Sequence, residues 1–292
     1  MKICIFEPSS PSHKNDLNNG LKILKKALSK NIKDIHIDFI SKDQKPNDKL
    51  PYISSDDDKK KDRFEKIFQK QVDIVFLTRG GYGCYRWISK VNWREITTNS
   101  NAKNVLVIGF SDATFLACAL IKNKMKFLHA PMISTLQMSN SSSIEALSNF
   151  ISSRVLPKVA GTPFKKGEFQ GELIGGNLTC LCHTIGTELE PNWNEKILFL
   201  EDVNEDIYKI DRMFTHLEMT GAFNKIGALC LGEFIFPVPE QKKQFPLLLE
   251  DKFSNFNKPV IFNLPCGHGN ENMPLLFGQN YKVAKSGFLI PI

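Results

Sequence analysis

Residues 105–121, VLVIGFSDATFLACALI, decide the fold class of this 292-residue chain. The unbroken apolar run at 105–108 is typical of a strand that is buried on both faces. The letters GFSD at 109–112 predict a turn, and the apolar stretch after them predicts a helix from Ala113 to about Ile121. A buried strand that passes through a short turn into a helix is the repeating piece of an α/β protein.

Predicted strands and helices also alternate in the sequence before this stretch. Three further strands are expected at 2–6, 35–40 and 72–77, with helices between them at 16–28 and 62–69. The polar segment 41–61, rich in Lys, Asp, Pro and Ser, is expected to be a solvated loop. This order predicts a parallel α/β sheet, in which functional residues collect at the carboxyl ends of the strands.

The composition of the chain changes after residue 135. A run of Ser and Asn at 139–143 and the Pro and Gly residues after it indicate a linker over residues 136–166. Beyond the linker we expect four strands and one clear helix, at 172–174, 197–200, 227–236, 260–264 and 208–220. We therefore predict two domains, residues 1–135 and residues 167–292.

Charge and composition exclude several kinds of protein. Lys and Arg number 38 against 31 Asp and Glu, a net charge of +7, but only six are Arg, which disfavours nucleic-acid binding. No apolar run is long enough for a membrane span, and the short apolar start is unlike a signal peptide, so we expect a cytoplasmic protein. The seven Cys are expected to be free thiols. The run CLCH at 180–183 lacks a second ligand pair, so no metal site is expected.

Ser111 lies on the turn between the strand and the helix of the opening stretch. In that position a serine hydroxyl is exposed beside a helix N-terminus, whose amides stabilise a developing oxyanion. The sequence departs from the pattern G-x-S-x-G, because Ala113 replaces the last glycine. A serine N-cap with Asp112 in the first helical turn fits the same letters equally well.

A glycine-rich loop, RGGYG at 79–83, follows the strand expected at 72–77. Three glycines in four positions let a backbone approach a ligand closely and present its N–H groups. Nucleotide binding is disfavoured, because neither G-x-G-x-x-G nor a following Lys-Ser/Thr is present. A donor to an oxyanion and a simple tight turn remain as alternatives.

The second domain offers an acid and a base. His268 lies between two glycines just after a predicted strand, where its ring can project into a cleft, and His129 is the next most interesting histidine. Glu201 ends an apolar strand, where a carboxylate can orient a histidine. Cys266 is a less favoured nucleophile, since it need not meet His268 two positions away. Ser111, Glu201 and His268 compose a candidate catalytic triad.

Six motifs in order along the chain resemble the LD-carboxypeptidase family of serine peptidases. This family includes the muramoyl-tetrapeptide carboxypeptidases and the microcin C self-immunity hydrolases. The matching segments are PSS at 8–10, RGGYG at 79–83, GFSDAT at 109–114, GGNL at 175–178, EDV at 201–203 with YKIDR at 208–212, and GH at 267–268.

The resemblance implies an amidotransferase-like parallel α/β domain followed by a smaller, β-rich, barrel-like domain. It implies that Ser111 is the nucleophile, His268 the general base and later acid, and Glu201, rather than Glu205, the residue that orients His268. The backbone N–H groups of Asp112 and of Gly81 (or Gly80) would form the oxyanion hole. The resemblance implies a homodimer, and it implies no metal or cofactor.

The implied activity is release of terminal D-alanine from cytoplasmic murein tetrapeptides during peptidoglycan recycling. The partner is a small peptide substrate, with no nucleic acid and no membrane. Candidate substrate-binding residues are Arg79, Tyr82 and Arg86. One alternative is hydrolysis of a peptidyl-nucleotide or acyl-sulfamoyl adenylate in antibiotic self-immunity, for which Trp193 could stack on an adenine. Another is a non-catalytic peptide-binding protein on the same fold.

Overall fold

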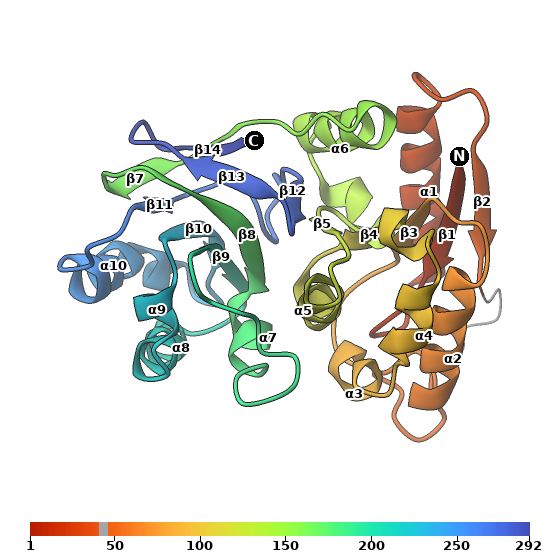
Figure 1. Ribbon diagram of the computed structural model, residues 1–292, viewed down its shortest axis with the longest axis horizontal. Coiled ribbons are helices and arrows are strands. Elements are labelled where there is room, and N and C mark those ends of the chain that lie inside the picture. The colour runs from red at the N-terminus through yellow and green to blue at the C-terminus, as the bar shows by residue number, and fades with distance from the viewer. Residues whose placement is uncertain (41–45) are drawn as a thin grey trace. The chain divides into compact units, whose positions relative to one another are not determined.

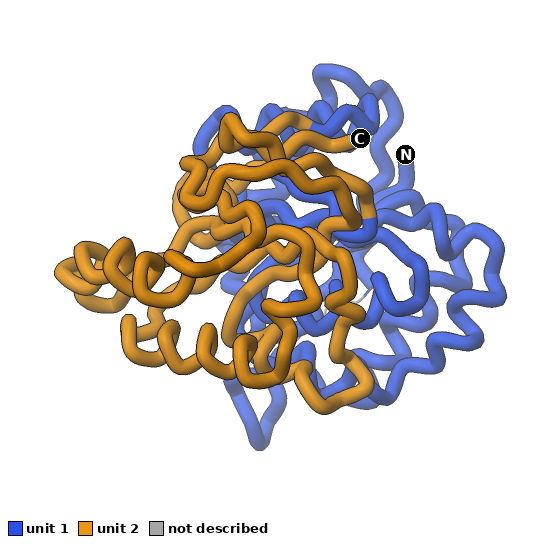
Figure 2. The backbone as a smooth tube through the Cα atoms, turned by 60° about the vertical axis from the view of Figure 1, so that its left-hand side comes forward, with its two compact units in different colours: residues 1–156, 274–278 blue, residues 157–273, 279–292 orange. Residues whose placement is uncertain are grey.

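The computed structural model describes residues 1–40 and 46–292 (Figure 1). They form two compact units, and neither unit is a continuous piece of chain (Figure 2). Unit 1 comprises residues 1–156 and 274–278, and unit 2 comprises residues 157–273 and 279–292. Residues 41–45 of the loop expected at 41–61 lie outside the described residues.

Unit 1 is built on a six-stranded sheet in the order β12-β5-β4-β3-β1-β2. Strands β1 to β5 are parallel, and β12 runs antiparallel to β5. This confirms the parallel α/β sheet predicted from the alternating pattern. The strands are β1 (Lys2–Phe6), β2 (His36–Phe39), β3 (Ile74–Leu77), β4 (Leu106–Gly109), β5 (Phe127–His129) and β12 (Leu275–Phe277).

Side chains that alternate along β1 bury both faces of this sheet against helices. Ile3 and Ile5 belong to the core that includes residues of α1 and α6, whereas Phe6 packs against Phe64 of α2 and Trp87 of α3. Because helices cover both faces of the sheet, loops at the carboxyl ends of the parallel strands are where functional residues can lie. The helices are α1 (Lys14–Leu28), α2 (Asp57–Phe68), α3 (Cys84–Ile88), α4 (Trp93–Thr98), α5 (Thr114–Lys122) and α6 (Ser141–Ser153), with 3-10 turns η1 (Ala102–Asn104), η2 (Ser111–Ala113) and η3 (Ile133–Met138).

The segment expected as a linker, 136–166, is folded instead. Its first half contains α6, which the Asn140 side chain caps by accepting a hydrogen bond from the Ser143 N–H at 2.9 Å. Leu147 and Ile151, one turn apart, are buried in the unit 1 core. Six serines within α6 conceal this apolar spacing. The chain passes from unit 1 to unit 2 between residues 156 and 157.

Two further expectations are corrected. Residues 167–292 were expected in one domain, but β12 completes the unit 1 sheet because its three apolar residues are buried beside β5. The expected loop at 41–61 ends early, because α2 begins at Asp57 and Lys60 within it is 1% exposed. The many charged residues around Lys60 predict that it is solvated, but it lies on the helix face that packs inward.

Unit 2 is built on an eight-stranded sheet in the order β6-β14-β13-β8-β9-β10-β11-β7. Its two edge strands, β6 and β7, are consecutive along the chain and are joined at Gly161. The sheet must therefore curl until its two edges come together, which is the barrel-like arrangement that the resemblance implied. The strands are β6 (Val159–Ala160), β7 (Thr162–Lys165), β8 (Phe169–Asn177), β9 (Lys196–Val203), β10 (Ala228–Ile235), β11 (Val260–Phe262), β13 (Asn280–Val283) and β14 (Phe288–Pro291).

Short helices complete unit 2: α7 (Leu178–Cys182), α8 (Ile207–Met219), α9 (Ala222–Lys225), η4 (Pro239–Lys243) and α10 (Phe245–Phe253). The helix predicted near 208–220 is α8. Among the helices at residues 1–40 and 46–292, none is long and apolar enough to span a membrane.

Candidate active site

Ser111 occupies a strained turn at the carboxyl end of β4. Its φ is +64°, in the left-handed region, which costs a residue other than glycine roughly 1–2 kcal/mol. The N-cap of α5 is Ala113, so the alternative of a serine N-cap for this helix is wrong. Strain of this kind is typical of a nucleophile held on a strand-to-helix turn.

The backbone of Gly80, after β3, lies directly against the Ser111 side chain. A Cβ at Gly80 would stand 2.9 Å from Ser111 Oγ and 3.4 Å from the Asp112 nitrogen, so glycine is required there. Gly81 has a φ of +103°, and the Tyr82 N–H next to it donates to Ser10 Oγ at 3.0 Å. The glycine-rich loop is thus fixed beside the Ser111 hydroxyl and the Asp112 N–H.

The Asp112 carboxylate is a buried anchor of this turn. Its Oδ2 accepts hydrogen bonds from Ser9 Oγ at 2.5 Å and from the Cys84 N–H at 2.8 Å. Burial raises the pKa of Asp112, while these two hydrogen bonds and the charge of Lys60 act in the opposite direction. Asp112 therefore ties together the loop after β1, the start of α3 and the turn after β4.

In unit 2, Glu201 and His268 form a hydrogen-bonded pair. The two atoms, Glu201 Oε2 and His268 Nδ1, are 2.7 Å apart, and the Glu201 side chain is fully buried. A carboxylate can only accept, so Nδ1 carries the proton and Nε2 of the neutral ring is the basic nitrogen. Burial alone would lower the pKa of His268, but the Glu201 charge and hydrogen bond, with the Asp202 and Glu233 charges, raise it overall.

Asp202, next to Glu201 in sequence, has a different task. Its carboxylate accepts hydrogen bonds from Asn177 Nδ2 (2.9 Å), from the Thr179 N–H (2.9 Å) and Oγ1 (2.8 Å), and from the Val203 N–H (2.8 Å). Burial, and after it the charge of Glu201, raises the pKa of Asp202 to about 6. Asp202 joins β9 to the start of α7 and so fixes the strand end that carries Glu201.

Glycines flank His268 because carboxylates crowd its turn. A Cβ at Gly267, whose φ is +143°, would stand 3.1 Å from Glu201 Oε2. A Cβ at Gly269 would stand 1.8 Å from Oε2 of Glu233 on β10. Glu233 was missed by the sequence reasoning, although a charged residue inside the apolar strand at 228–235 was a signal for it.

The candidate substrate-binding residues lie in unit 1. Arg79 donates from Nη1 to the Pro11 carbonyl at 3.1 Å. Arg86 forms a two-pronged ion pair with Asp57, with Nη2 2.9 Å from Oδ2, so its guanidinium already holds a carboxylate of this chain. Tyr82 is 46% exposed, and its ring lies 5.9 Å from that of Tyr52.

Three other residues singled out in the sequence are buried. The Cys266 thiol is fully buried, which raises its pKa well above the ordinary value and disfavours it as a nucleophile. His129 packs between the rings of Phe110 and Phe277. Trp193 is 4% exposed and donates from Nε1 to Glu190 at 2.9 Å, so its ring offers no open face for stacking.

Residues 180–183 do not assemble a metal site. Within the described residues, no group of three or more His, Cys, Asp or Glu is placed to hold a metal ion. Burial raises the pKa of Cys182 to about 12, which keeps the thiol protonated. In the matching segment 208–212, Asp211 pairs with Lys252 at 3.0 Å, and Arg212 lies over the Tyr208 ring.

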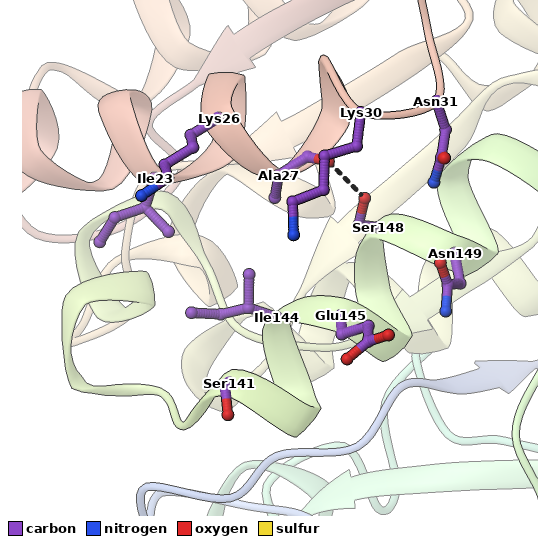
Figure 3. A pocket seen from close by; sticks show the side chains of 10 residues that line it. All are labelled: Ile23, Lys26, Ala27, Lys30, Asn31, Ser141, Ile144, Glu145, Ser148 and Asn149. Atoms are coloured by element: carbon purple, nitrogen blue, oxygen red, sulfur yellow. Dashed lines mark hydrogen bonds between the residues drawn. The ribbon is translucent and has the colours of Figure 1, made fainter.

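Each unit contains a cavity. One, of about 510 Å³, lies between α1 and α6, and no predicted site residue lines it. Figure 3 shows its lining residues, among which Ser148 Oγ donates to the Ala27 carbonyl. The other, of about 360 Å³, is in unit 2 and reaches the His268 turn through Asn270, Glu271 and Glu233.

Comparisons with known proteins match the chain in two parts. A family model described as "LD-carboxypeptidase N-terminal domain" matches residues 3–130, and one described as "LD-carboxypeptidase C-terminal domain" matches residues 170–283. The murein tetrapeptide carboxypeptidase of Pseudomonas aeruginosa is 30% identical, over 71% of this chain and 71% of its own length. The microcin C7 self-immunity protein of Escherichia coli is 31% identical over 39% of this chain and 34% of its own length.

Solved structures share the fold across the whole chain. A muramoyltetrapeptide carboxypeptidase from Oxalobacter formigenes superposes with a TM-score of 0.84 at 24% identity, covering 100% of this chain and 98% of its own. The microcin self-immunity protein bound to glutamyl sulfamoyl guanosine superposes with a TM-score of 0.84 at 19% identity, covering 100% and 96%. The resemblance noted in the sequence is therefore confirmed: this chain belongs to the LD-carboxypeptidase family of serine peptidases.

Proposed function

We propose that this chain is a cytoplasmic serine carboxypeptidase that hydrolyses the L,D peptide bond of murein tetrapeptides and releases D-alanine for peptidoglycan recycling. The observation that carries the proposal is the hydrogen bond between Glu201 and His268, which leaves a basic nitrogen on a histidine oriented by a buried carboxylate. The strained Ser111 turn supports it from unit 1.

In the proposed reaction, His268 Nε2 accepts the Ser111 hydroxyl proton as Oγ attacks the scissile carbonyl. The N–H groups of Asp112 and Gly81 (or Gly80) stabilise the oxyanion that forms. His268 then gives its proton to the departing D-alanine amine, and a water molecule, activated by the same ring, hydrolyses the acyl-enzyme. Glu201 holds the tautomer and stabilises the imidazolium between these steps.

The microcin-like alternative rests on the partial match to the self-immunity protein. The burial of Trp193 argues against an adenine stacked on that ring. A non-catalytic binding protein is disfavoured, since it has no need for a strained serine or for a histidine paired to a buried acid. From the resemblance alone we also propose a homodimer, which light scattering would measure directly.

A panel of substrates separates these functions. We expect purified protein to release D-alanine from a murein tetrapeptide, to leave the D,D bond of the pentapeptide intact, and to act far more slowly on aspartyl sulfamoyl adenosine. Chromatography of the products measures all three reactions. Faster cleavage of the adenosine compound would replace the proposal by the self-immunity function, and no cleavage at all, with no labelling by a fluorophosphonate, would support the binding protein.

Gly269→Ala is expected to lower kcat by roughly 100-fold, because its methyl group would collide with Glu233 and displace the His268 turn. Gly186→Ala is the control for an added methyl group that meets nothing, because no atom lies within 4 Å of the added Cβ. Its φ of +78° strains an alanine there, whereas Gly269 has no such φ, so a normal rate in this control is the stricter comparison. Adding Glu233→Ala to Gly269→Ala should recover part of the rate. Equal rates for the two alanine variants would show that Glu233 does not constrain the turn.

A further inference from the structure

Lys60 is a buried lysine that the proposed mechanism does not use. It lies on α2 with 1% of its surface exposed, and Nζ donates a hydrogen bond of 3.2 Å to the Ser9 carbonyl. In the part of the chain that the structure describes, no carboxylate forms an ion pair with it. A Cβ at Gly83 would stand 3.2 Å from Nζ, so the glycine-rich loop leaves room for the ammonium.

Ser9 connects this ammonium to Asp112. The residue is fully buried, its carbonyl accepts from Lys60, and its hydroxyl donates to Asp112 Oδ2 at 2.5 Å. The same Oδ2 accepts from the Cys84 N–H at the start of α3. The relay Lys60–Ser9–Asp112 therefore links α2, the loop after β1 and the turn that carries Ser111.

The opposite charges of Lys60 and Asp112 stabilise each other. An isolated buried carboxylate or ammonium is costly, and each is far less so when an opposite charge lies nearby in a medium of low dielectric constant. Burial lowers the pKa of Lys60 and raises that of Asp112, and each charge opposes the shift of the other. Glu7 and Asp57 add to the negative field around the ammonium.

We infer that Lys60 is a positioning residue of this active site. Through Ser9, its buried ammonium fixes the Asp112 carboxylate and with it the Asp112 N–H that donates to the oxyanion. This inference rests on the proposed function. The oxyanion exists only in the transition state and the intermediate, so loosening its donor lowers kcat more than it raises KM.

The test compares Lys60→Met with Lys60→Arg and with Lys59→Met. Lys60→Met keeps the length of the side chain and removes its charge, Lys60→Arg keeps the charge, and Lys59 is an exposed neighbour paired with Asp56. We expect Lys60→Met to lower kcat about tenfold, less than the 10²–10³-fold loss typical of deleting an oxyanion donor, with KM changed less than about twofold. Lys60→Arg should recover most of the rate, and Lys59→Met should match the wild type.

A Lys60→Met kcat within about twofold of the Lys59→Met value would overturn the inference, as would equal losses in Lys60→Met and Lys60→Arg. Should Lys60→Met not fold, Ser9→Ala tests the same relay, since it removes the hydroxyl that holds Asp112 and leaves the carbonyl that holds Lys60. An unchanged kcat in Ser9→Ala would also overturn it. A wild-type protein that releases no D-alanine counts against the proposed function instead, and labelling rates with a fluorophosphonate still rank the variants.

Discussion

Ser111→Ala is expected to lower kcat for D-alanine release by about 10⁶-fold, the loss typical of removing the nucleophile of a serine hydrolase triad. Oγ is the hydroxyl that this turn holds against Gly80. Alanine and serine tolerate the φ of +64° similarly, so the variant should unfold at the wild-type temperature. D-alanine release and thermal unfolding, measured on the same preparation, check both parts.

Ser153→Ala is the control for this variant. Its hydroxyl is exposed on α6 and donates to the Asn149 carbonyl at 2.7 Å, so its loss should leave the rate unchanged. Mass spectrometry after treatment with a fluorophosphonate should show one adduct on the wild type and none on Ser111→Ala. Activity retained by a correctly folded Ser111→Ala protein would eliminate the proposed mechanism.

Glu201→Gln has the second-largest expected effect, a fall in kcat on the order of 10⁴-fold, as for other triad acids replaced by their amides. A glutamine can turn its NH₂ group towards His268 Nδ1 and so favour the tautomer with its proton on Nε2. That nitrogen could then accept no proton from Ser111. Glu250→Gln, an exposed change on α10, is the matched control and should keep the full rate.

The pH profile gives this variant a signature that a simple loss of folding would lack. The pKa of His268 is raised in the wild type, burial being outweighed by the Glu201 charge and hydrogen bond. The neutral ring is the active form, so wild-type activity should rise with pH through a value above that of an ordinary histidine. In Glu201→Gln the two largest raising causes are gone and only the Asp202 and Glu233 charges remain, so the residual activity should rise at lower pH. If the activity of Glu201→Gln rose over the same pH range as that of the wild type, Glu201 would not face the catalytic base.

The stability of the fold should also depend on the ionisation of His268, but it should fall with rising pH, whereas activity rises. A histidine whose pKa is raised by folding stabilises the native state below its unfolded pKa, and this contribution is lost as pH rises through the folded pKa. Glu201→Gln should therefore fall furthest below the wild-type unfolding temperature in mildly acidic solution. The gap should narrow above neutral pH.

Features signalled within a short window of sequence were predictable. The strand β4, its turn and α5 follow from apolar runs and a glycine, and these place Ser111 at a sheet edge. The segment LLF at 275–277 is as apolar as any strand, but nothing local to it tells which sheet it completes. Helix α6 was missed because polar residues outnumber the apolar ones that bury it.

The candidate site divides in the same way. Glu201 and His268 are 67 positions apart, and no spacing pairs them. An acid at a strand end and a histidine between two glycines suggested the pair, and the family resemblance then implied it. Asp112 was predicted for its backbone N–H alone, because its side-chain partner Ser9 lies 103 positions away. Lys60 stands in a run of charged residues that looks uniformly solvated, and the fold decides which of them turns inward.

The antiparallel strand β12 is the last strand of its sheet to be synthesised. The sheet that carries Ser111 gains its last strand, residues 275–277, after His268 has already been made. Until then the edge of β5 presents unpaired N–H and C=O groups, the kind of edge that invites aggregation. A nascent chain that stops short of residue 277 therefore lacks the last strand of the sheet that carries Ser111.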